Sequence, residues 1–520
     1  MTPPAHSLRL SPADLRLEVP AGTRLQDVLF AQGVEFPCGG RGRCKGCRVK
    51  VLRGNLPASP EENHLLTSTE REAGWRLACR HSIAGDLELE LAQWEMSVLG
   101  DDSSFAFTPS EGWGVAIDLG TTTIAAQLLD LQTGNVLGVR TALNAQARHG
   151  GDIMSRVEFA MHGGQTELQR LVREQLGEMV NQLLEKRSSK AGRDALPRVP
   201  ADQQVGPTAR EEKLKRVVIV GNTVMHHLFG GINIAPLSAY PFEPTQPGRF
   251  RLSPRELGWD LPEDTVVEFP PCLGGFVGSD ILAGIVATGL HESRELVALM
   301  DLGTNGEVVV GNRERMLCTS TAAGPAFEGA RIWMGMRAAT GAISAVQVED
   351  NFITCRVIGG GEPRGLCGSG LVDAVAAGLE LEWIHPSGRM ANRKEMPLAG
   401  PVILSATDVR ELQLAKGAIA AGLRMLTARL GASLEDIEQL HLAGAFGNYI
   451  SRASAQRIGL LRVPLDRVLP AGNTALLGAK RALFEEAALW DAIAKRVEHV
   501  SLNEDPNFQE IYAEEMRFPG

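Results

Sequence analysis

The chain has 520 residues, of which 22% are charged and 44% hydrophobic, and its formal net charge is −10. This length predicts several domains with sizeable cores, and the acidic balance argues against a dedicated nucleic-acid binder. No apolar run approaches the length of a membrane-spanning helix. No charged-then-apolar pattern opens the chain, so the sequence predicts a cytoplasmic protein.

The N-terminal segment alternates apolar and polar residues in the way expected of short strands. Residues 7–20 predict two strands, and a helix follows with Thr23 as its N-cap. Further strands are predicted at 48–52 and 87–91. Strands around one helix, with a cysteine-rich loop after that helix, predict a β-grasp domain of the ferredoxin type over residues 1–98.

Four of the eight cysteines form a pattern in this domain. Cys38, Cys44 and Cys47 lie in one glycine-rich loop, and Cys79 stands alone further along. Three thiolates from one loop and one from a distant strand hold a plant-type [2Fe–2S] cluster, although the first spacing here is one residue longer. The glycines let the loop curl and turn N–H groups toward the cluster sulfurs. A structural zinc site, usually built from two C-x-x-C pairs, is the alternative, and buried thiols without a ligand are the third.

Two polar segments follow. Residues 99–112, which include Asp101 and Ser104, predict a linker. Residues 187–215 are rich in Ser, Lys, Arg, Pro and Gln and carry few large apolar groups. This composition predicts a flexible, solvent-exposed insertion.

One short motif occurs twice in the remaining sequence, each time at the end of an apolar strand. The first copy contains Asp118, Gly120, Thr121, Thr122 and Thr123, and the second contains Asp301, Gly303, Thr304, Asn305, Gly306 and Glu307. A carboxylate at a strand end can hold Mg²⁺ through water, because that ion keeps much of its hydration. Glycine lets a hairpin approach phosphate closely, and threonine hydroxyls bind phosphate oxygens. Two such hairpins facing one another would clamp a triphosphate and its metal ion from both sides.

The paired motifs resemble the phosphate 1 and phosphate 2 loops of the actin, sugar-kinase and Hsp70 ATPase superfamily. Residues 217–223 resemble its first connecting segment, 441–447 its adenosine-binding glycine turn, and 473–479 its second connecting helix. The resemblance implies an α/β multidomain protein, in which a two-lobed, actin-like ATPase with an RNase H-like repeat follows the β-grasp domain. Its lobes are expected at 113–290 and 291–520.

The first connecting segment departs from the sugar kinases of this superfamily, which place a catalytic Asp near it. The run 221–227 offers Asn222 and Thr223 and contains no carboxylate. A general base for phosphoryl transfer to a sugar is therefore not evident. A water molecule positioned by neutral groups is suited to slow ATP hydrolysis that drives a conformational change of the protein.

Longer strings resemble a narrower family, the reductive activators of corrinoid proteins. They occupy residues 301–307, 322–330, 366–373 and 444–447. The family carries an N-terminal [2Fe–2S] domain and a C-terminal actin-like ATPase, and it reduces the inactive Co(II) corrinoid of methyltransferase systems to Co(I). The resemblance implies a homodimer, a corrinoid protein as binding partner, and an upstream reductase or ferredoxin as the source of electrons.

The resemblance also implies roles for single residues. Asp118 and Asp301 would orient Mg²⁺, and Glu307 is counted with them as catalytic. The ligands of the cluster would be Cys38, Cys44, Cys47 and Cys79. The phosphates would be held by Gly120, Thr121, Thr122, Thr123, Gly303, Thr304, Asn305 and Gly306. The adenosine would be bordered by Gly444, Ala445, Phe446 and Gly447.

Thermodynamics supports the combination of a ferredoxin with an ATPase. A plant-type cluster has a potential near −400 mV, and one-electron transfer over an uphill gap of roughly 100–200 mV costs about 2–5 kcal/mol. Nucleotide binding and closure can supply that energy as differential affinity between two conformations. The sequence thus predicts an ATP-dependent, low-potential electron donor. A redox-sensing, nucleotide-dependent binding protein and a ferredoxin-fused kinase of a small metabolite are the alternatives.

Overall fold

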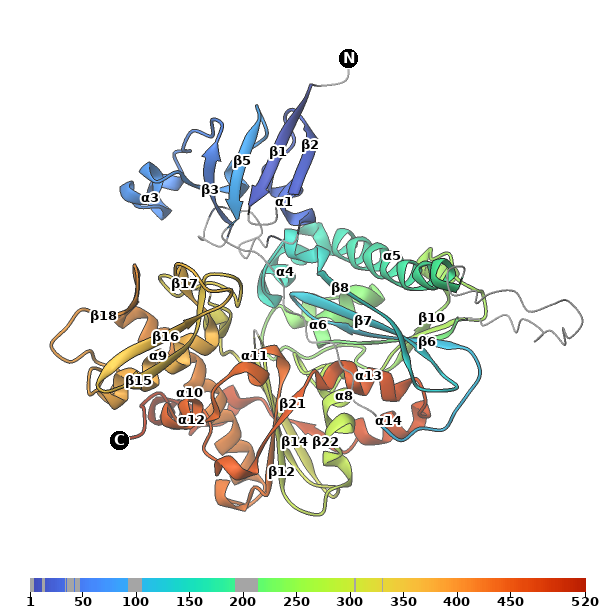
Figure 1. Ribbon diagram of the computed structural model, residues 1–520. Helices are drawn as coiled ribbons and strands as arrows, with labels where there is room; N and C mark the ends of the chain where they lie inside the picture. The colour runs from blue at the N-terminus through green and yellow to red at the C-terminus, as the bar shows by residue number, and fades with distance from the viewer. Residues whose placement is uncertain are drawn as a thin grey trace, which may run out of the picture.

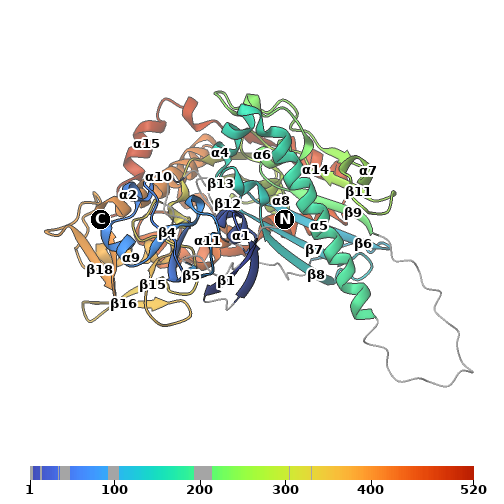
Figure 2. The same cartoon turned by 90° about the horizontal axis from the view of Figure 1, so that it is seen from above.

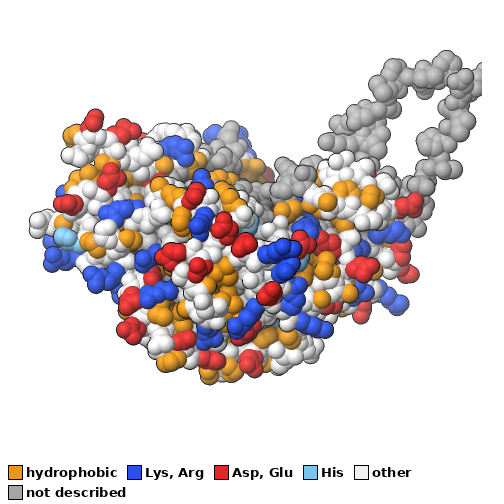
Figure 3. Space-filling model, turned by 90° about the horizontal axis from the view of Figure 1, so that it is seen from below, with side chains coloured by type: hydrophobic (Ala, Val, Ile, Leu, Met, Phe, Trp, Pro, Cys, Tyr) orange, Lys and Arg blue, Asp and Glu red, His pale blue; other side chains and the backbone are white. Residues whose placement is uncertain are grey.

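The protein folds into a small N-terminal domain that stands on two larger lobes (Figure 1). The computed structural model describes residues 4–11, 15–32, 34, 42, 47–91, 105–191, 214–303, 305–329 and 331–520. Within these ranges no helix is long and apolar enough to cross a membrane. The face seen from below carries acidic and basic side chains interspersed, without a large patch of one sign (Figure 3).

The N-terminal domain is a five-stranded sheet packed on one helix. Its strands lie in the order β2 (Leu15–Pro20), β1 (Ala5–Ser11), β5 (Leu87–Leu91), β3 (Arg48–Arg53) and β4 (Trp75–Leu77). Helix α1 (Leu25–Ala31) covers one face, where Leu8 and Leu89 of the sheet and Leu25 of the helix share one apolar core. Two short helices, α2 (Glu62–Leu65) and α3 (Ser68–Glu72), precede β4. The predicted β-grasp arrangement is confirmed.

Two local predictions in this domain are wrong. Thr23 does not cap α1, because its hydroxyl donates to the carbonyl oxygen of Pro20 at 2.7 Å and closes the turn after β2. Arg24 is the N-cap residue, and its side chain makes no capping bond. Cys79 lies in a 3₁₀ helix, η1 (Ala78–Arg80), that follows β4, and not in a strand.

The first lobe is built on a six-stranded sheet. Its strands lie in the order β10 (Phe250–Leu252), β11 (Val266–Phe269), β9 (Leu214–Val220), β6 (Trp113–Leu119), β7 (Thr123–Asp130) and β8 (Val136–Leu143). The lobe's helices are α4 (Ile153–Phe159), α5 (Gln165–Ala191), α6 (Thr223–Gly230), α7 (Pro254–Leu257) and α8 (Ser279–Thr288). Helix α5 contributes residues 187–191 of the predicted insertion, and residues 192–213 lie outside the described ranges.

The second lobe repeats five strands of this topology, while its sixth strand, β22 (Val497–His499), lies at the other edge of the sheet. Its main sheet has the order β21 (Val468–Gly472), β20 (Gln439–Ala443), β12 (Val297–Leu302), β13 (Gly306–Gly311), β14 (Met316–Thr321) and β22. Strand β12 lies between antiparallel β13 and parallel β20, just as β6 lies between antiparallel β7 and parallel β9. The repeat confirms the two-lobed, actin-like architecture.

Further elements complete the second lobe. The helices are α9 (Gly368–Glu380), α10 (Ala406–Arg429), α11 (Gly444–Tyr449), α12 (Arg452–Arg457), α13 (Thr474–Ala482), α14 (Ala487–Ala494) and α15 (Phe508–Glu515). Two small sheets contain β15 (Ala342–Glu349), β16 (Phe352–Val357) and β17 (Gly365–Leu366), and β18 (Glu395–Ala399) and β19 (Val402–Ser405).

Helices α8 and α13 join the lobes through a shared core. A Cβ atom on Gly478 of α13 would lie 2.3 Å from the carbonyl oxygen of Ala283 in α8, so a glycine is needed for this close approach. The core also contains Ala116 from the first sheet and Leu299 from the second. The lobes therefore interlock, and the predicted boundary at residue 290 stays a prediction.

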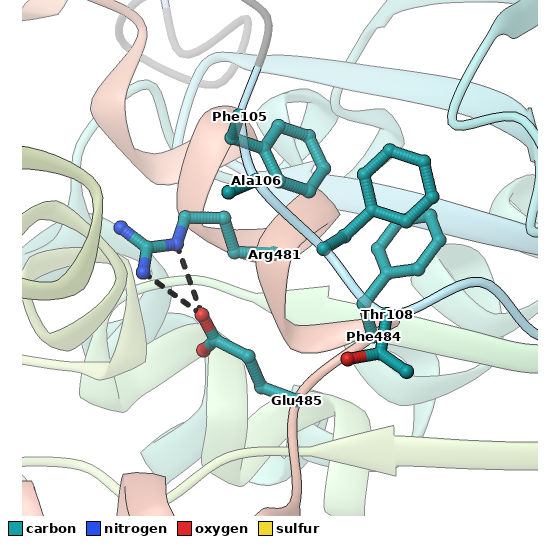
Figure 4. Close-up of a pocket in the computed structure, with 7 residues that line it drawn as sticks. Phe105, Ala106, Thr108, Arg481, Phe484 and Glu485 are labelled. Carbon is teal, nitrogen blue, oxygen red and sulfur yellow. Dashed lines mark hydrogen bonds and ion pairs between the residues drawn. The ribbon is translucent and has the colours of Figure 1, made fainter.

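The end of the linker is fixed to the ATPase. Phe105 and Phe107 pack against Phe484, just beyond α13, with ring centroids 5.6 and 4.5 Å away. Figure 4 shows the linker residues beside a pocket of 340 Å³, where Arg481 donates to Glu485 at 3.0 Å. Residues 99–104 of the predicted linker lie outside the described ranges.

Candidate functional site

The two repeated motifs form matching hairpins at the ends of equivalent strands. Asp118 lies near the end of β6 and Asp301 near the end of β12. In the first hairpin Gly120 donates its N–H to the carbonyl oxygen of Thr123 at 3.1 Å, and a Cβ atom on Gly120 would lie 2.5 Å from that oxygen. In the second, Gly303 donates to the carbonyl oxygen of Asn305 at 3.0 Å. Thr304 lies outside the described residues.

Three asparagines from separate elements hold the first hairpin. The side-chain amide of Asn144, after β8, donates to the carbonyl oxygen of Gly120 at 2.9 Å. Asn222, the N-cap of α6, donates to Thr121 Oγ1 at 3.0 Å. Asn473, the N-cap of α13, donates to Asp118 Oδ2 at 3.0 Å. Both connecting segments predicted from the sequence thus contact the first hairpin.

One hydroxyl in this hairpin is left for a ligand. Thr122 Oγ1 is buried and has no hydrogen-bond partner among the described residues. A buried hydroxyl normally finds a partner, and a phosphate oxygen is an acceptor that this hydroxyl can bind.

Asp118 and Asp301 sit in an environment that favours a bound cation. Burial raises the pKa of Asp118 to about 6, against the effect of the Asn473 amide. Burial and the charge of Asp118 raise the pKa of Asp301 to about 7. The described residues contain no group of three or more His, Cys, Asp or Glu side chains able to hold a metal ion directly. Two neighbouring carboxylates are donors that suit a hydrated Mg²⁺, because that ion keeps most of its water ligands.

Asp280 is a carboxylate that the sequence motifs did not indicate. It lies in the first turn of α8, and its N–H donates to the carbonyl oxygen of Gly221 at 3.4 Å. A Cβ atom on Gly278 would lie 2.1 Å from that same oxygen, so α8 begins in close contact with the first connecting segment. Burial, followed by the charge of Asp301, raises the pKa of Asp280 to about 8.

Residues 221–227 contain no carboxylate, but α8 places Asp280 beside them. A carboxylate therefore does lie near the first connecting segment, contrary to the expectation from the sequence. The pairing joins residues far apart in the chain. The available signal was an acidic residue that follows glycine and serine and directly precedes the apolar run 281–287.

Glu307 faces the same cluster of carboxylates. Burial, then the charges of Asp280 and Asp301, raises the pKa of Glu307 well above its ordinary value. Its Oε1 accepts from Ser320 Oγ at 3.1 Å. His226 and His227, near Asn222, are fully buried within the first lobe. His226 lies against Phe250 and Phe269, which makes it a packing residue.

The predicted adenosine turn lies against the second hairpin. Gly444 has φ +84°, and a Cβ atom on it would lie 2.6 Å from Asp301 Oδ1. Phe446 stacks on Phe327, with ring centroids 4.5 Å apart. Gly447 is buried. Asn305 precedes β13 and Gly306 is the first residue of that strand, while the side chain of Ala445 lies outside the described residues.

The described cysteines of the cluster motif lie close together in the N-terminal domain. Cys47 and Cys79 are both buried in its core. The N–H of Ala78, next to Cys79, donates to the carbonyl oxygen of Cys47 at 3.0 Å. Cys38 and Cys44 lie outside the described residues.

Three family models match the chain in order. The 2Fe-2S iron-sulfur cluster binding domain matches residues 8–84. The RACo middle region matches residues 113–193 and 203–293, and the C-terminal domain of RACo, the ASKHA domain, matches residues 295–520. The [2Fe–2S] domain type and a nucleotide-binding ATPase fold are therefore established.

Similar proteins share this organisation over most of their length. The corrinoid activation enzyme RamQ of Eubacterium limosum is 35% identical over 432 residues, which cover 77% of this chain and 69% of RamQ. The [Co(II) methylated amine-specific corrinoid protein] reductase of Methanosarcina barkeri is 27% identical over 443 residues, covering 78% and 77%. The solved structure of a reductive activator for a corrinoid, iron–sulfur protein superposes with a TM-score of 0.66 at 25% identity, covering 99% of this chain and 98% of that one. The chain belongs to the family of reductive activators of corrinoid proteins.

Proposed function

We propose that this protein uses ATP to reduce the inactive Co(II) corrinoid of a partner corrinoid protein to Co(I). The main support for this proposal is that one chain joins a ferredoxin-type domain to an ATPase whose paired hairpins contain Asp118 and Asp301. Related proteins named as corrinoid activators and reductases support this reaction.

The N-terminal domain would hold the [2Fe–2S] cluster, which supplies one electron at low potential when bound. The proposed ligands are Cys38, Cys44, Cys47 and Cys79. The burial of Cys47 and Cys79 in one core supports their share of this assignment. An upstream reductase or ferredoxin would return the cluster to its reduced state.

The ATPase would bind ATP between its two hairpins. Asp118 and Asp301 would hold a hydrated Mg²⁺, and the unpartnered hydroxyl of Thr122 would bind a phosphate oxygen. Gly444 and Phe446 would border the adenosine. Asp280, beside the first connecting segment, would orient the attacking water and accept its proton during hydrolysis.

A homodimer in the cytoplasm is the proposed setting, carried over from the family. ATP-driven closure would then provide the few kcal/mol that an uphill electron transfer needs. Helices α8 and α13 support this coupling of ATP binding to electron transfer. They pack in one core with β6 and β12, the strands that lead into the two hairpins.

The test is an anaerobic assay with the purified protein, a Co(II) corrinoid protein, a chemical reductant and MgATP. The Co(I) absorption band should grow with ATP and stay near its starting level without it. A redox sensor would change only its binding to the partner, and equal reduction without nucleotide would refute the proposal.

A metabolite kinase remains a second candidate, because Asp280 provides the base that the sequence appeared to lack. Product analysis after incubation with ATP and small sugars or acids separates the two. A phosphorylated metabolite formed at the rate of ATP consumption would favour the kinase.

A further inference from the structure

The ferredoxin-type domain contacts both ATPase lobes. On the first lobe, the guanidinium of Arg148 lies over the ring of Phe30 in α1, 4.9 Å from its centroid. Leu143 and Ala147 of that lobe also join the apolar core of the N-terminal domain. On the second lobe, Arg364 Nη1 lies 2.8 Å from Glu90 Oε1 in β5. The two views show the domain above the junction of the lobes (Figures 1 and 2).

The first contact is bonded directly to the phosphate 1 hairpin. Asn144 donates its N–H to the carbonyl oxygen of Thr122 at 2.8 Å and its side-chain amide to that of Gly120 at 2.9 Å. Asn144 also caps the 3₁₀ turn η2 (Ala145–Arg148), which carries Arg148 to the ring of Phe30. A movement of the hairpin would therefore also move the η2 turn, whose Arg148 contacts α1.

The second contact is connected to the adenosine turn through backbone pairing and side-chain packing. Arg364 precedes β17, and Leu366 in that strand exchanges backbone hydrogen bonds with the 334–336 segment at 2.9 and 3.0 Å. Directly after β17, Gly368 packs so closely that a Cβ atom on it would lie 1.9 Å from the carbonyl oxygen of Phe327. Phe327 stacks on Phe446 of the turn. Each lobe thus links its nucleotide loop to its own contact with the domain.

The contacts between the ferredoxin-type domain and the lobes are weak enough to separate. The Arg364 and Glu90 side chains are 42% and 18% exposed, so their ion pair is screened by solvent and weak. An open groove of about 610 Å³, lined by Phe30 and by residues of β8 and α5, borders the contact with the first lobe.

We propose that the ferredoxin-type domain is a latch across the two lobes, which nucleotide binding opens. ATP contacts one loop on each lobe and so changes their spacing, and a rigid domain cannot keep both contacts when the spacing changes. The partly exposed Arg364–Glu90 pair breaks first, and the domain then keeps its contact with the first lobe. Release uncovers the surface of the N-terminal domain that Leu143, Ala147 and Arg148 now cover.

Hydrogen exchange on the full-length, cluster-loaded protein tests the latch, which rests on the proposed function. In the native protein, a non-hydrolysable ATP analogue should raise exchange about three- to tenfold in peptides 143–148 and 87–91. Arg364→Glu and Glu90→Arg should each give this increase without nucleotide, because like charges then face each other. The double variant Glu90→Arg/Arg364→Glu should return exchange to within about twofold of native and regain the response.

Arg315→Glu is the matched control, because it breaks the Arg315–Glu498 pair of 3.0 Å on the second lobe and should leave both peptides unchanged. Native exchange in Arg364→Glu, no response to the analogue, or a chain-wide increase that the double variant does not reverse would each overturn the latch. If only the latch is wrong, the native protein still forms Co(I) in an ATP-dependent reaction. If the proposed function is wrong, the native protein forms no Co(I) with ATP.

Discussion

At the scale of single residues, the nucleotide site depends on carboxylates drawn from separate parts of the chain. Asp118 and Asp301 come from repeated motifs and could be located in the sequence. Asp280 could not, because contacts between distant parts of the chain, such as the packing of Gly278 on Gly221, bring α8 to the first connecting segment. Its pKa of about 8, raised first by burial and then by Asp301, suits a group that accepts a proton near neutral pH.

We expect Asp280→Asn to lower ATP hydrolysis by about 10²- to 10³-fold, since an amide cannot accept the proton of the attacking water. Affinity for a fluorescent ATP analogue should change less than about threefold. Native turnover should rise between pH 6 and pH 8 as Asp280 ionises, and the variant should lose that rise. Phosphate release across this pH range measures both.

Asp260→Asn is the control for this change, because Asp260 is an exposed residue of the same lobe and its variant should keep native turnover. Native hydrolysis in Asp280→Asn would remove Asp280 from the mechanism.

At the scale of elements, the turn that begins α11 must approach β12 very closely. Gly444 meets this need in two ways, because its φ is +84° and a Cβ atom would lie 2.7 Å from the carbonyl oxygen of Leu302. The string around it was recognisable in the sequence. Its contact with Asp301 depends on the parallel pairing of β12 with β20, which brings together strands well separated in the chain.

Gly444→Ala should weaken nucleotide binding about tenfold or more, because the added carbon displaces the turn from Asp301. The visible spectrum of the cluster should stay native. Gly431→Ala is the matched control: Gly431 also has a positive φ, +72°, but a Cβ atom there meets nothing within 4 Å. Its variant carries only the backbone strain, about 1 kcal/mol. Titration with a fluorescent nucleotide compares them, and equal affinities would refute the steric argument.

At the scale of the whole molecule, the N-terminal domain and the ATPase have largely separate cores. Among the described residues, Leu143 and Ala147 of the first lobe join the N-terminal core. Cluster chemistry and nucleotide binding should therefore respond separately to local changes, although their positions are coupled.

Cys79→Ser should abolish or strongly alter the visible and paramagnetic-resonance signals of the [2Fe–2S] cluster, since serine replaces a thiolate ligand. Nucleotide affinity should stay within about twofold of native. Cys355→Ser, in β16 of the second lobe, should leave both properties unchanged. A native cluster spectrum in the Cys79 variant would overturn the ligand assignment, and lost nucleotide binding would contradict the separation of the units.

Local patterns in the chain are enough to predict the two kinds of module and their order. The short strings around Cys47, Asp118 and Asp301 are recognisable because strand, turn and reactive side chain are neighbours in the chain. The contact of Asp280 with Gly221 and the ion pair of Glu90 with Arg364 follow instead from the packing of the folded chain. Such pairs are set by the packing of distant elements, and nothing in the local pattern of either partner encodes where the other will lie.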